Sequence, residues 1–188
     1  MNGYELKQKM EAGGIVYGTM LSMSRNPRWS VPMSNFGLDY VVIDTEHSPR
    51  GRDDVADFLA AFNFSGVVSI VRVPIPDSHY ITMALDAGAH GILAPYVETV
   101  EEAKEVVAAA KWRPLKGAQV RRIIDSGEFP SDATKAYLEN RNRNSICIVG
   151  IESVPAIENL DNILNVSGID AIFVGPNDLS ISLGIPDQ

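Results

Sequence analysis

The chain has 188 residues, of which 45% are hydrophobic and 21% charged, a composition typical of one soluble domain with a substantial core. Its 24 acidic and 16 basic side chains give a formal net charge of −8, which argues against a general nucleic-acid binder because phosphate backbones require clustered Lys and Arg. No apolar stretch approaches the roughly 20 residues of a membrane span, and the polar N-terminus does not resemble a signal peptide. The single cysteine, Cys147, lies in an apolar run, so we expect a buried thiol, no disulfide framework and a cytoplasmic location.

Short β-branched runs alternate with longer amphipathic segments along the chain. Strands are expected over residues 15–21, 40–44, 67–73, 91–95, 117–120, 146–151 and 171–174, and the pattern is weakest at 117–120. Helices are expected over residues 53–63, 78–87, 99–111 and 155–164. Their ends are marked by an acidic first turn, by Gly88, by the capping-box spacing of Thr99 and Glu102, and by Pro155. This alternation is typical of βαβ units around a parallel sheet.

The number of strands favours an α/β fold of the TIM (β/α)8 barrel type over an open doubly wound sheet. A dinucleotide-binding sheet is disfavoured because no Gly-x-Gly-x-x-Gly follows the first strand. Barrels of this type typically need about 250 residues. We therefore expect residues 1–188 to form a single domain that lacks the eighth strand and the C-terminal helices, or in which another element covers the exposed edges of the sheet.

Polar residues directly follow several of the apolar runs. They are Asp44, Glu46 and His47 after the second expected strand, Arg72 at the end of the third, Glu152 after the sixth and Asp178 after the seventh. The carboxyl ends of parallel strands meet at one edge of a sheet, where α/β enzymes assemble their sites. We therefore expect these side chains to converge.

Glu152 and Asp178 are hard oxygen ligands on neighbouring expected strands. Together with waters and a bidentate substrate they would complete an octahedron around Mg²⁺ or Mn²⁺. The alternative is that both are solvated carboxylates or helix N-caps.

Arg72 ends a buried strand and needs a partner, because an unpaired buried guanidinium is costly. It either forms a structural salt bridge to Asp44 or Glu46, or binds a substrate carboxylate and stabilises oxyanion charge. His47 lies three residues after Asp44, which could orient its ring and raise its basicity, as a general base requires. His79 and His90 lack such a setting and are expected to be structural or surface residues.

Five motifs of the chain resemble those of the HpcH/HpaI aldolases. They are Asp44-Thr45-Glu46-His47-Ser48-Pro49, Val71-Arg72-Val73-Pro74, Leu85-Asp86-Ala87-Gly88-Ala89, Ile151-Glu152 and Gly175-Pro176-Asn177-Asp178-Leu179-Ser180. The resemblance runs in the right order through nearly the whole chain. It implies a class II, metal-dependent pyruvate aldolase with a (β/α)8 barrel, and a homo-oligomer, usually a hexamer, that exchanges C-terminal helices.

The resemblance also implies roles for individual residues. By motif, Glu152 and Asp178 match the ligands of a divalent metal (Mg²⁺, Mn²⁺ or Co²⁺), and Glu46 matches a carboxylate near the metal waters. His47 with Asp44 matches the base dyad, and Arg72 matches the pyruvate-binding arginine. Gly175 and Pro176 match substrate-binding positions, and Asp86 matches an aspartate near the site across a subunit interface. Two departures affect the expected substrate. Many family members have Gln where this chain has Gly150, and the usual Arg-Gly-x-Gly is replaced around Lys116-Gly117-Ala118-Gln119.

The function expected from these residues is reversible cleavage of a 4-hydroxy-2-oxo acid into pyruvate and an aldehyde. One alternative is an acyl-CoA lyase like citrate lyase β-subunits and malyl-CoA lyases. The Asp-x-Glu-His-x-Pro motif and the lack of a basic patch for the CoA phosphates argue against this alternative. Another is a non-catalytic barrel or fragment that only binds a partner. Small 2-oxo acids and aldehydes are the expected substrates, with no nucleic acid or membrane as partner.

Overall fold

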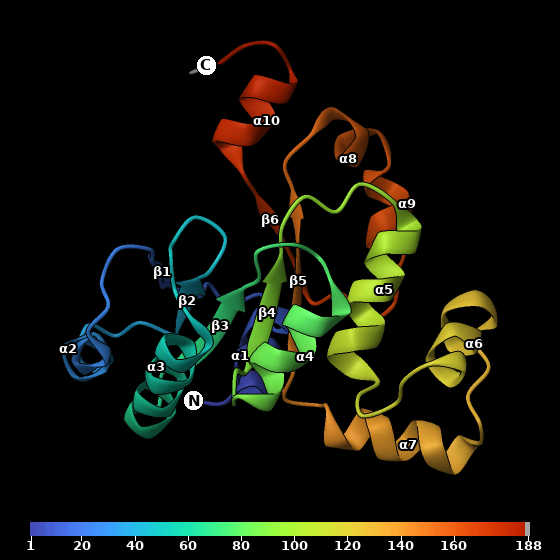
Figure 1. Ribbon diagram of the computed structural model, residues 1–188, viewed down its shortest axis with the longest axis horizontal. Coiled ribbons are helices and arrows are strands. Elements are labelled where there is room, and N and C mark those ends of the chain that lie inside the picture. Colours follow the sequence, from blue (N-terminus) through green and yellow to red (C-terminus); the bar gives the residue numbers. More distant parts are fainter. Residues whose placement is uncertain (187–188) are drawn as a thin grey trace.

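The computed structural model describes residues 1–186, and within them six parallel strands form one sheet in the order β1-β2-β3-β4-β5-β6 (Figure 1). The strands are β1 (Gly18–Leu21), β2 (Tyr40–Asp44), β3 (Val68–Arg72), β4 (Gly91–Ala94), β5 (Ile146–Ile151) and β6 (Ala171–Val174). The helices are α1 (Gly3–Glu11), α2 (Ser30–Asn35), α3 (Arg52–Ser65), α4 (Ser78–Asp86), α5 (Val100–Lys111), α6 (Ala118–Ser126), α7 (Asp132–Arg141), α8 (Val154–Glu158), α9 (Leu160–Leu164) and α10 (Pro176–Ser182).

The predicted parallel α/β architecture is confirmed, as a curled half-barrel whose strand order follows the sequence. The strand expected at 117–120 is wrong, because Gly117 at φ 63 precedes helix α6. In that helix Val120, Ile123 and Ile124 recur at helical spacing, and Ile123 is buried. The described residues thus contain six strands of the expected eight-stranded barrel.

The two faces of the sheet are covered differently because side chains alternate along each strand. The outer face carries Ile43, Val71, Ile92 and other buried apolar residues that belong to the same core as buried residues of helices α3, α4 and α5. The inner, concave face carries a second apolar cluster that includes Leu6 of α1. This face lines a hollow of about 400 Å³. The core of the molecule is therefore the layer between the sheet and its outer helices.

Helix boundaries follow local signals in most places. Thr99 caps α5 with the expected capping box, in which the side chains of Thr99 and Glu102 each accept a hydrogen bond from the backbone of the other. The helix expected over 155–164 is divided at Asn159, whose side chain donates to the carbonyl of Glu98 at 3.0 Å. The long-range hydrogen bond thus fixes the chain where α8 gives way to α9.

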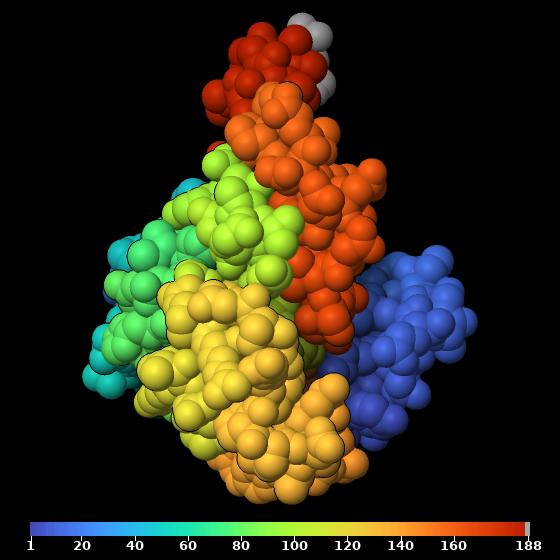
Figure 2. All heavy atoms as spheres, turned by 90° about the vertical axis from the view of Figure 1, so that its right-hand side faces the viewer, coloured from blue at the N-terminus to red at the C-terminus, as the bar shows by residue number. Residues whose placement is uncertain are grey.

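Helix α10 projects beyond the carboxyl edge of the sheet, as the ribbon and the space-filling view both show (Figures 1 and 2). Strands β1 and β6 are the outermost strands of the sheet. In the part of the chain that the structure describes, no helix combines the length and the apolar character needed to cross a membrane.

Candidate active site

Strand alternation brings the predicted polar residues to one end of the concave face. In the register of β2 and β3, Asp44 lies opposite Arg72, and both follow the inner positions Val42 and Ile70 by two residues. Glu152 lies four residues after Ile148 of β5 and therefore on the same, inner face as Ile148. Because parallel strands share one direction, these side chains all lie at the carboxyl edge of the sheet.

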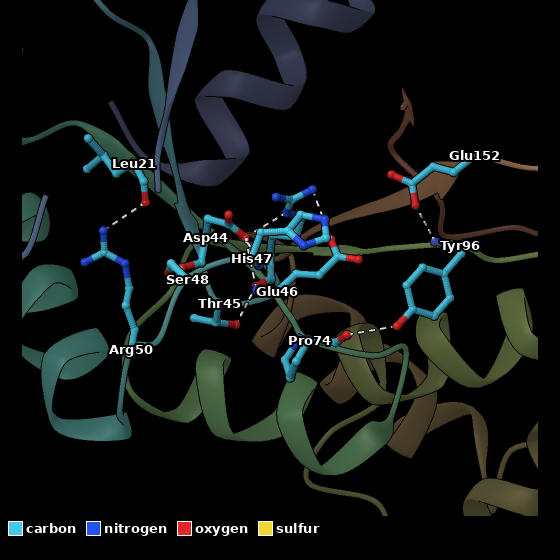
Figure 3. Close-up of polar contacts among 11 residues, drawn as sticks. Leu21, Asp44, Thr45, Glu46, His47, Ser48, Arg50, Pro74, Tyr96 and Glu152 are labelled. Atoms are coloured by element: carbon cyan, nitrogen blue, oxygen red, sulfur yellow. Dashed lines mark hydrogen bonds and ion pairs between the residues drawn. The ribbon is translucent and has the colours of Figure 1, made fainter. Parts of the chain in front are cut away.

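Arg72 is the centre of a buried ion-pair cluster (Figure 3). Its Nε donates to Asp44 Oδ1 at 2.8 Å, and its Nη1 lies 3.0 Å from Glu46 Oε2. Arg72 is 7% exposed and Asp44 0%. Within residues 1–186 the third guanidinium nitrogen, Nη2, makes no hydrogen bond. The expected salt bridges are therefore both present, and one edge of the guanidinium remains free to bind an anion.

The charges of the cluster stabilise one another against burial. Burial opposes ionisation of Asp44, but the hydrogen bond and charge of Arg72 outweigh it and hold the pKa of Asp44 below its usual value. Burial raises the pKa of Glu46, which Arg72 only partly offsets. Among the described residues, Asp44 Oδ2 is buried without a hydrogen-bond partner. Buried acceptors in native structures nearly always have a partner, so this unpaired oxygen is unusual.

His47 is not oriented by Asp44 in the way that the sequence spacing suggested. Asp44 Oδ1 accepts hydrogen bonds from the backbone N–H groups of Glu46 and His47, at 3.0 and 3.4 Å, and from Arg72. The His47 ring is instead nearest Glu46, with Nε2 3.7 Å from Oε2, and its side chain is 62% exposed. The short loop after β2 thus directs the backbone toward Asp44 and the imidazole toward solvent and Glu46 (Figure 3).

Glu152 lies buried between two neighbouring strand ends. Its Oε2 accepts a hydrogen bond from the backbone N–H of Tyr96 at 2.9 Å. Gly175, which follows β6, passes so close that an added Cβ would come within 2.7 Å of Glu152 Oε1. A side chain at residue 175 would therefore displace the Glu152 carboxylate from this position.

Tyr96, which lies between β4 and α5, belongs to none of the motifs found in the sequence. Among the described residues it is the non-glycine residue with positive φ, at 33°. Its position directly after the apolar run of β4, at the same sheet edge as Asp44 and Arg72, is the signal that could have indicated it.

Pro176, the first residue of α10, and Asp178, in the first turn of that helix, are both exposed. Within residues 1–186 no group of three or more His, Cys, Asp or Glu side chains is arranged to hold a metal ion, and Asp178 makes no side-chain hydrogen bond or ion pair that would connect it to Glu152. Glu152 Oε1 makes no hydrogen bond to the described residues, whereas Oε2 does. Carboxylate oxygens of this kind are the donor chemistry that suits Mg²⁺ or Mn²⁺.

Asp86 does not join this cluster within the chain. It ends α4, and a helix that follows a parallel strand runs back toward the amino edge of the sheet. Its side chain is 67% exposed and pairs with Arg113 Nη1 at 2.8 Å. Both residues line a surface groove of about 570 Å³ between α4, α5 and α6.

His79, His90 and Cys147 lie outside the cluster at the carboxyl edge, as expected for structural or surface residues. His79 contacts Arg52 at 2.9 Å on the surface, and His90 Nδ1 accepts the backbone N–H of Ser69 at 3.2 Å. Burial lowers the pKa of His90. Cys147 is fully buried, and this burial raises the pKa of its thiol to about 12.

The curled parallel sheet places this chain among the barrel-type α/β proteins. The carboxylate–guanidinium cluster at the carboxyl edge of the sheet is a site that suits a small anionic ligand. The family model described as HpcH/HpaI aldolase/citrate lyase matches residues 19–188. The chain therefore belongs to the HpcH/HpaI aldolase/citrate lyase family.

Individual relatives cover nearly the whole chain. Hydroxypyruvate/pyruvate aldolase of Roseobacter denitrificans is 34% identical over 186 residues, which are 97% of this chain and 70% of the relative. The 2-keto-3-deoxy-L-rhamnonate aldolase of Salmonella gallinarum is 35% identical over 97% of this chain and 67% of the relative. The crystal structure of an HpcH/HpaI aldolase from Desulfitobacterium hafniense matches with a TM-score of 0.81 at 34% identity, covering 97% of this chain and 70% of that one.

Proposed function

We propose that this protein is a divalent-metal-dependent aldolase, a carbon–carbon lyase that reversibly cleaves a 4-hydroxy-2-oxo acid into pyruvate and an aldehyde. The names of the relatives, hydroxypyruvate/pyruvate aldolase and 2-keto-3-deoxy-L-rhamnonate aldolase, support a pyruvate aldolase. The observation that carries the proposal is the Arg72 guanidinium, held between Asp44 and Glu46 with one edge free, at the same sheet edge as Glu152.

Glu152 and Asp178 are proposed to hold the metal, with Glu46 beside it. A bound Mg²⁺ or Mn²⁺, or Co²⁺, would supply Lewis acidity for the 2-oxo group of the substrate. Asp44 belongs to the proposed site through Arg72, because its buried carboxylate keeps the guanidinium charged and fixed in place. The backbone at Gly175 and Pro176 is proposed to contact the substrate.

Arg72 is proposed to bind the substrate carboxylate through its free edge and to stabilise negative charge that develops on the adjacent oxygen. His47 accepts the proton of the C4 hydroxyl, directly or through water, as the C3–C4 bond breaks. The electron pair of that bond passes to C3, and the aldehyde leaves. The proton is then returned to C3, which completes pyruvate, and Glu46, 3.7 Å from His47 Nε2, orients the imidazole that carries it.

Asp86 is proposed to act at the site of a neighbouring subunit in a homo-oligomer, since it is exposed and lies at the amino edge of its own sheet. Such an assembly, a hexamer by resemblance to the family, would bring a charged groove of one subunit to the active edge of another. The proposed compartment is the cytoplasm.

The test is release of pyruvate from a panel of 4-hydroxy-2-oxo acids by the purified protein, with Mn²⁺ and with excess EDTA. We expect cleavage with Mn²⁺ and none with EDTA. Glu152→Gln should abolish it, whereas the matched surface variant Glu158→Gln on α8 should not. Cleavage that persists in EDTA would reject the metal role. Cleavage of an acyl-CoA ester in place of the oxo acids would favour the citrate lyase branch that the family description also names, and a protein without any cleavage would be a binding module.

A further inference from the structure

The backbone of Tyr96 has a strained conformation at the candidate site. Its φ of 33° lies in the left-handed region, which side-chain-bearing residues rarely adopt. This conformation accompanies the hydrogen bond from the Tyr96 N–H to Glu152 Oε2 at 2.9 Å. Strain of this kind persists only where the surroundings hold it, and it concentrates at functional sites.

Gly150 is the reason that the Tyr96 backbone can approach β5. A Cβ at residue 150 would lie 3.0 Å from Pro95 Cα and 3.1 Å from the Tyr96 nitrogen, both of which are backbone atoms. The Val97 N–H donates to the Gly150 carbonyl at 3.1 Å and joins the two segments. A side chain at residue 150 would therefore require the backbone after β4 to move away from β5.

The phenol of Tyr96 provides a second attachment. Its hydroxyl donates to the carbonyl of Pro74 at 3.1 Å, so one residue connects the segments after β3 and β4 with the end of β5 (Figure 3). On the far side of the segment, Glu98 accepts hydrogen bonds from Ser153 and Asn159. The strained residue is thus held on both sides.

We propose that Tyr96 is a positioning residue whose backbone N–H occupies Oε2 of Glu152 and leaves Oε1 as the oxygen that this carboxylate offers to a divalent cation. This inference rests on the proposed metal role of Glu152. The Tyr96–Pro74 hydrogen bond and the missing side chain at Gly150 hold the N–H in place. Metal affinity therefore depends on a residue that is itself no ligand.

The test measures the dissociation constant of Mn²⁺ by calorimetry for the wild type, Tyr96→Ala and Tyr96→Gly. Alanine loses the phenol and resists positive φ, so the segment relaxes and Mn²⁺ binds about tenfold more weakly. Glycine also loses the phenol but adopts positive φ freely, so Mn²⁺ binds only about threefold more weakly than to the wild type, and this remaining loss reflects the missing hydrogen bond to Pro74. If Tyr96 only filled space, Tyr96→Gly would bind Mn²⁺ more weakly than Tyr96→Ala, since glycine removes more of the side chain. We expect Tyr96→Ala to reach the kcat of the wild type when Mn²⁺ is saturating.

Gly150→Ala provides an independent variant, and Gly91→Ala its control. Gly91 lies at the opposite end of the same strand pair, and an added Cβ there would lie 2.8 Å from the Ile146 carbonyl oxygen. Both variants should unfold at lower temperature, but only Gly150→Ala should weaken Mn²⁺ binding. Equal affinities of the Ala and Gly variants at residue 96, or an unchanged affinity in Gly150→Ala, would overturn this inference alone. Failure of the wild type to bind Mn²⁺ would overturn it together with the proposed metal role.

Discussion

Replacement of Arg72 by alanine tests whether the ion-pair cluster is held together as described. The change removes the 2.8 Å hydrogen bond to Asp44 and the 3.0 Å contact with Glu46, and leaves both carboxylates in a buried setting. Breaking a buried ion pair from one side costs about 3–5 kcal/mol. Asp44 keeps its two backbone N–H donors, so we expect the lower end, about 3 kcal/mol of unfolding free energy at pH 7.5.

The loss should depend on pH in a direction set by Asp44. In the wild type the pKa of Asp44 is held below its usual value, so its contribution to stability is present above the unfolded pKa and is lost only as the pH falls through the folded one. Without Arg72, burial dominates and raises the pKa of Asp44. As the pH falls, Asp44 becomes protonated, its buried charge is removed and the variant regains stability. The difference between wild type and variant should therefore shrink from pH 7.5 to pH 5.

The assay is urea unfolding followed by circular dichroism at the two pH values. Arg121→Ala is the control, because its pair with Glu105 at 2.9 Å is exposed and such pairs contribute about 0–1 kcal/mol. Adding Asp44→Asn to Arg72→Ala should restore part of the stability, since it removes one buried charge. A loss below about 1 kcal/mol at pH 7.5, or an equal loss at both pH values, would mean that Arg72 does not offset the buried charge of Asp44.

Three other outcomes are expected. His47→Gln should lower kcat about 10²- to 10⁴-fold, as the loss of a general base does, whereas His79→Gln on the surface should leave kcat unchanged; equal kcat in both variants would exclude His47. Mixing His47→Gln with Asp86→Asn should restore part of the activity if Asp86 serves a neighbouring subunit, and no recovery would speak against that arrangement. Iodoacetamide at pH 8 should leave Cys147 unmodified in the folded protein and alkylate it in urea, because burial raises its pKa to about 12; rapid labelling of the folded protein, read by mass spectrometry, would contradict its burial.

Most of the sheet could be predicted because buried parallel strands have an unmistakable composition. Residues 40–44, 146–151 and 171–174 were expected as strands and match β2, β5 and β6 in both limits. The segment at 117–120 was misread because four residues are too few to separate a strand from the start of an amphipathic helix. Extending the window to Ile123 and Ile124 reveals the helical period.

The site was predictable as far as strand ends determine it. Asp44 and Arg72 were expected to meet, and the β2–β3 register pairs them. The partner of the His47 ring was not predictable, since proximity in sequence does not say whether the backbone or the side chain faces Asp44. Tyr96 was missed because its contribution comes from a dihedral angle and from the close approach of Gly150, neither of which leaves a pattern in the sequence.

The alternation of side chains along β2 has a consequence for how this protein tolerates change. Ile43 belongs to the outer core and Asp44 to the polar cluster, although they are adjacent residues of one strand. Deleting a single residue upstream within β2 would rotate both by half a turn, pressing a carboxylate into the helix layer and an isoleucine into the cluster. Length variation in this lineage should therefore accumulate in the connections, such as the stretch between α6 and α7, while the strands keep their residue count.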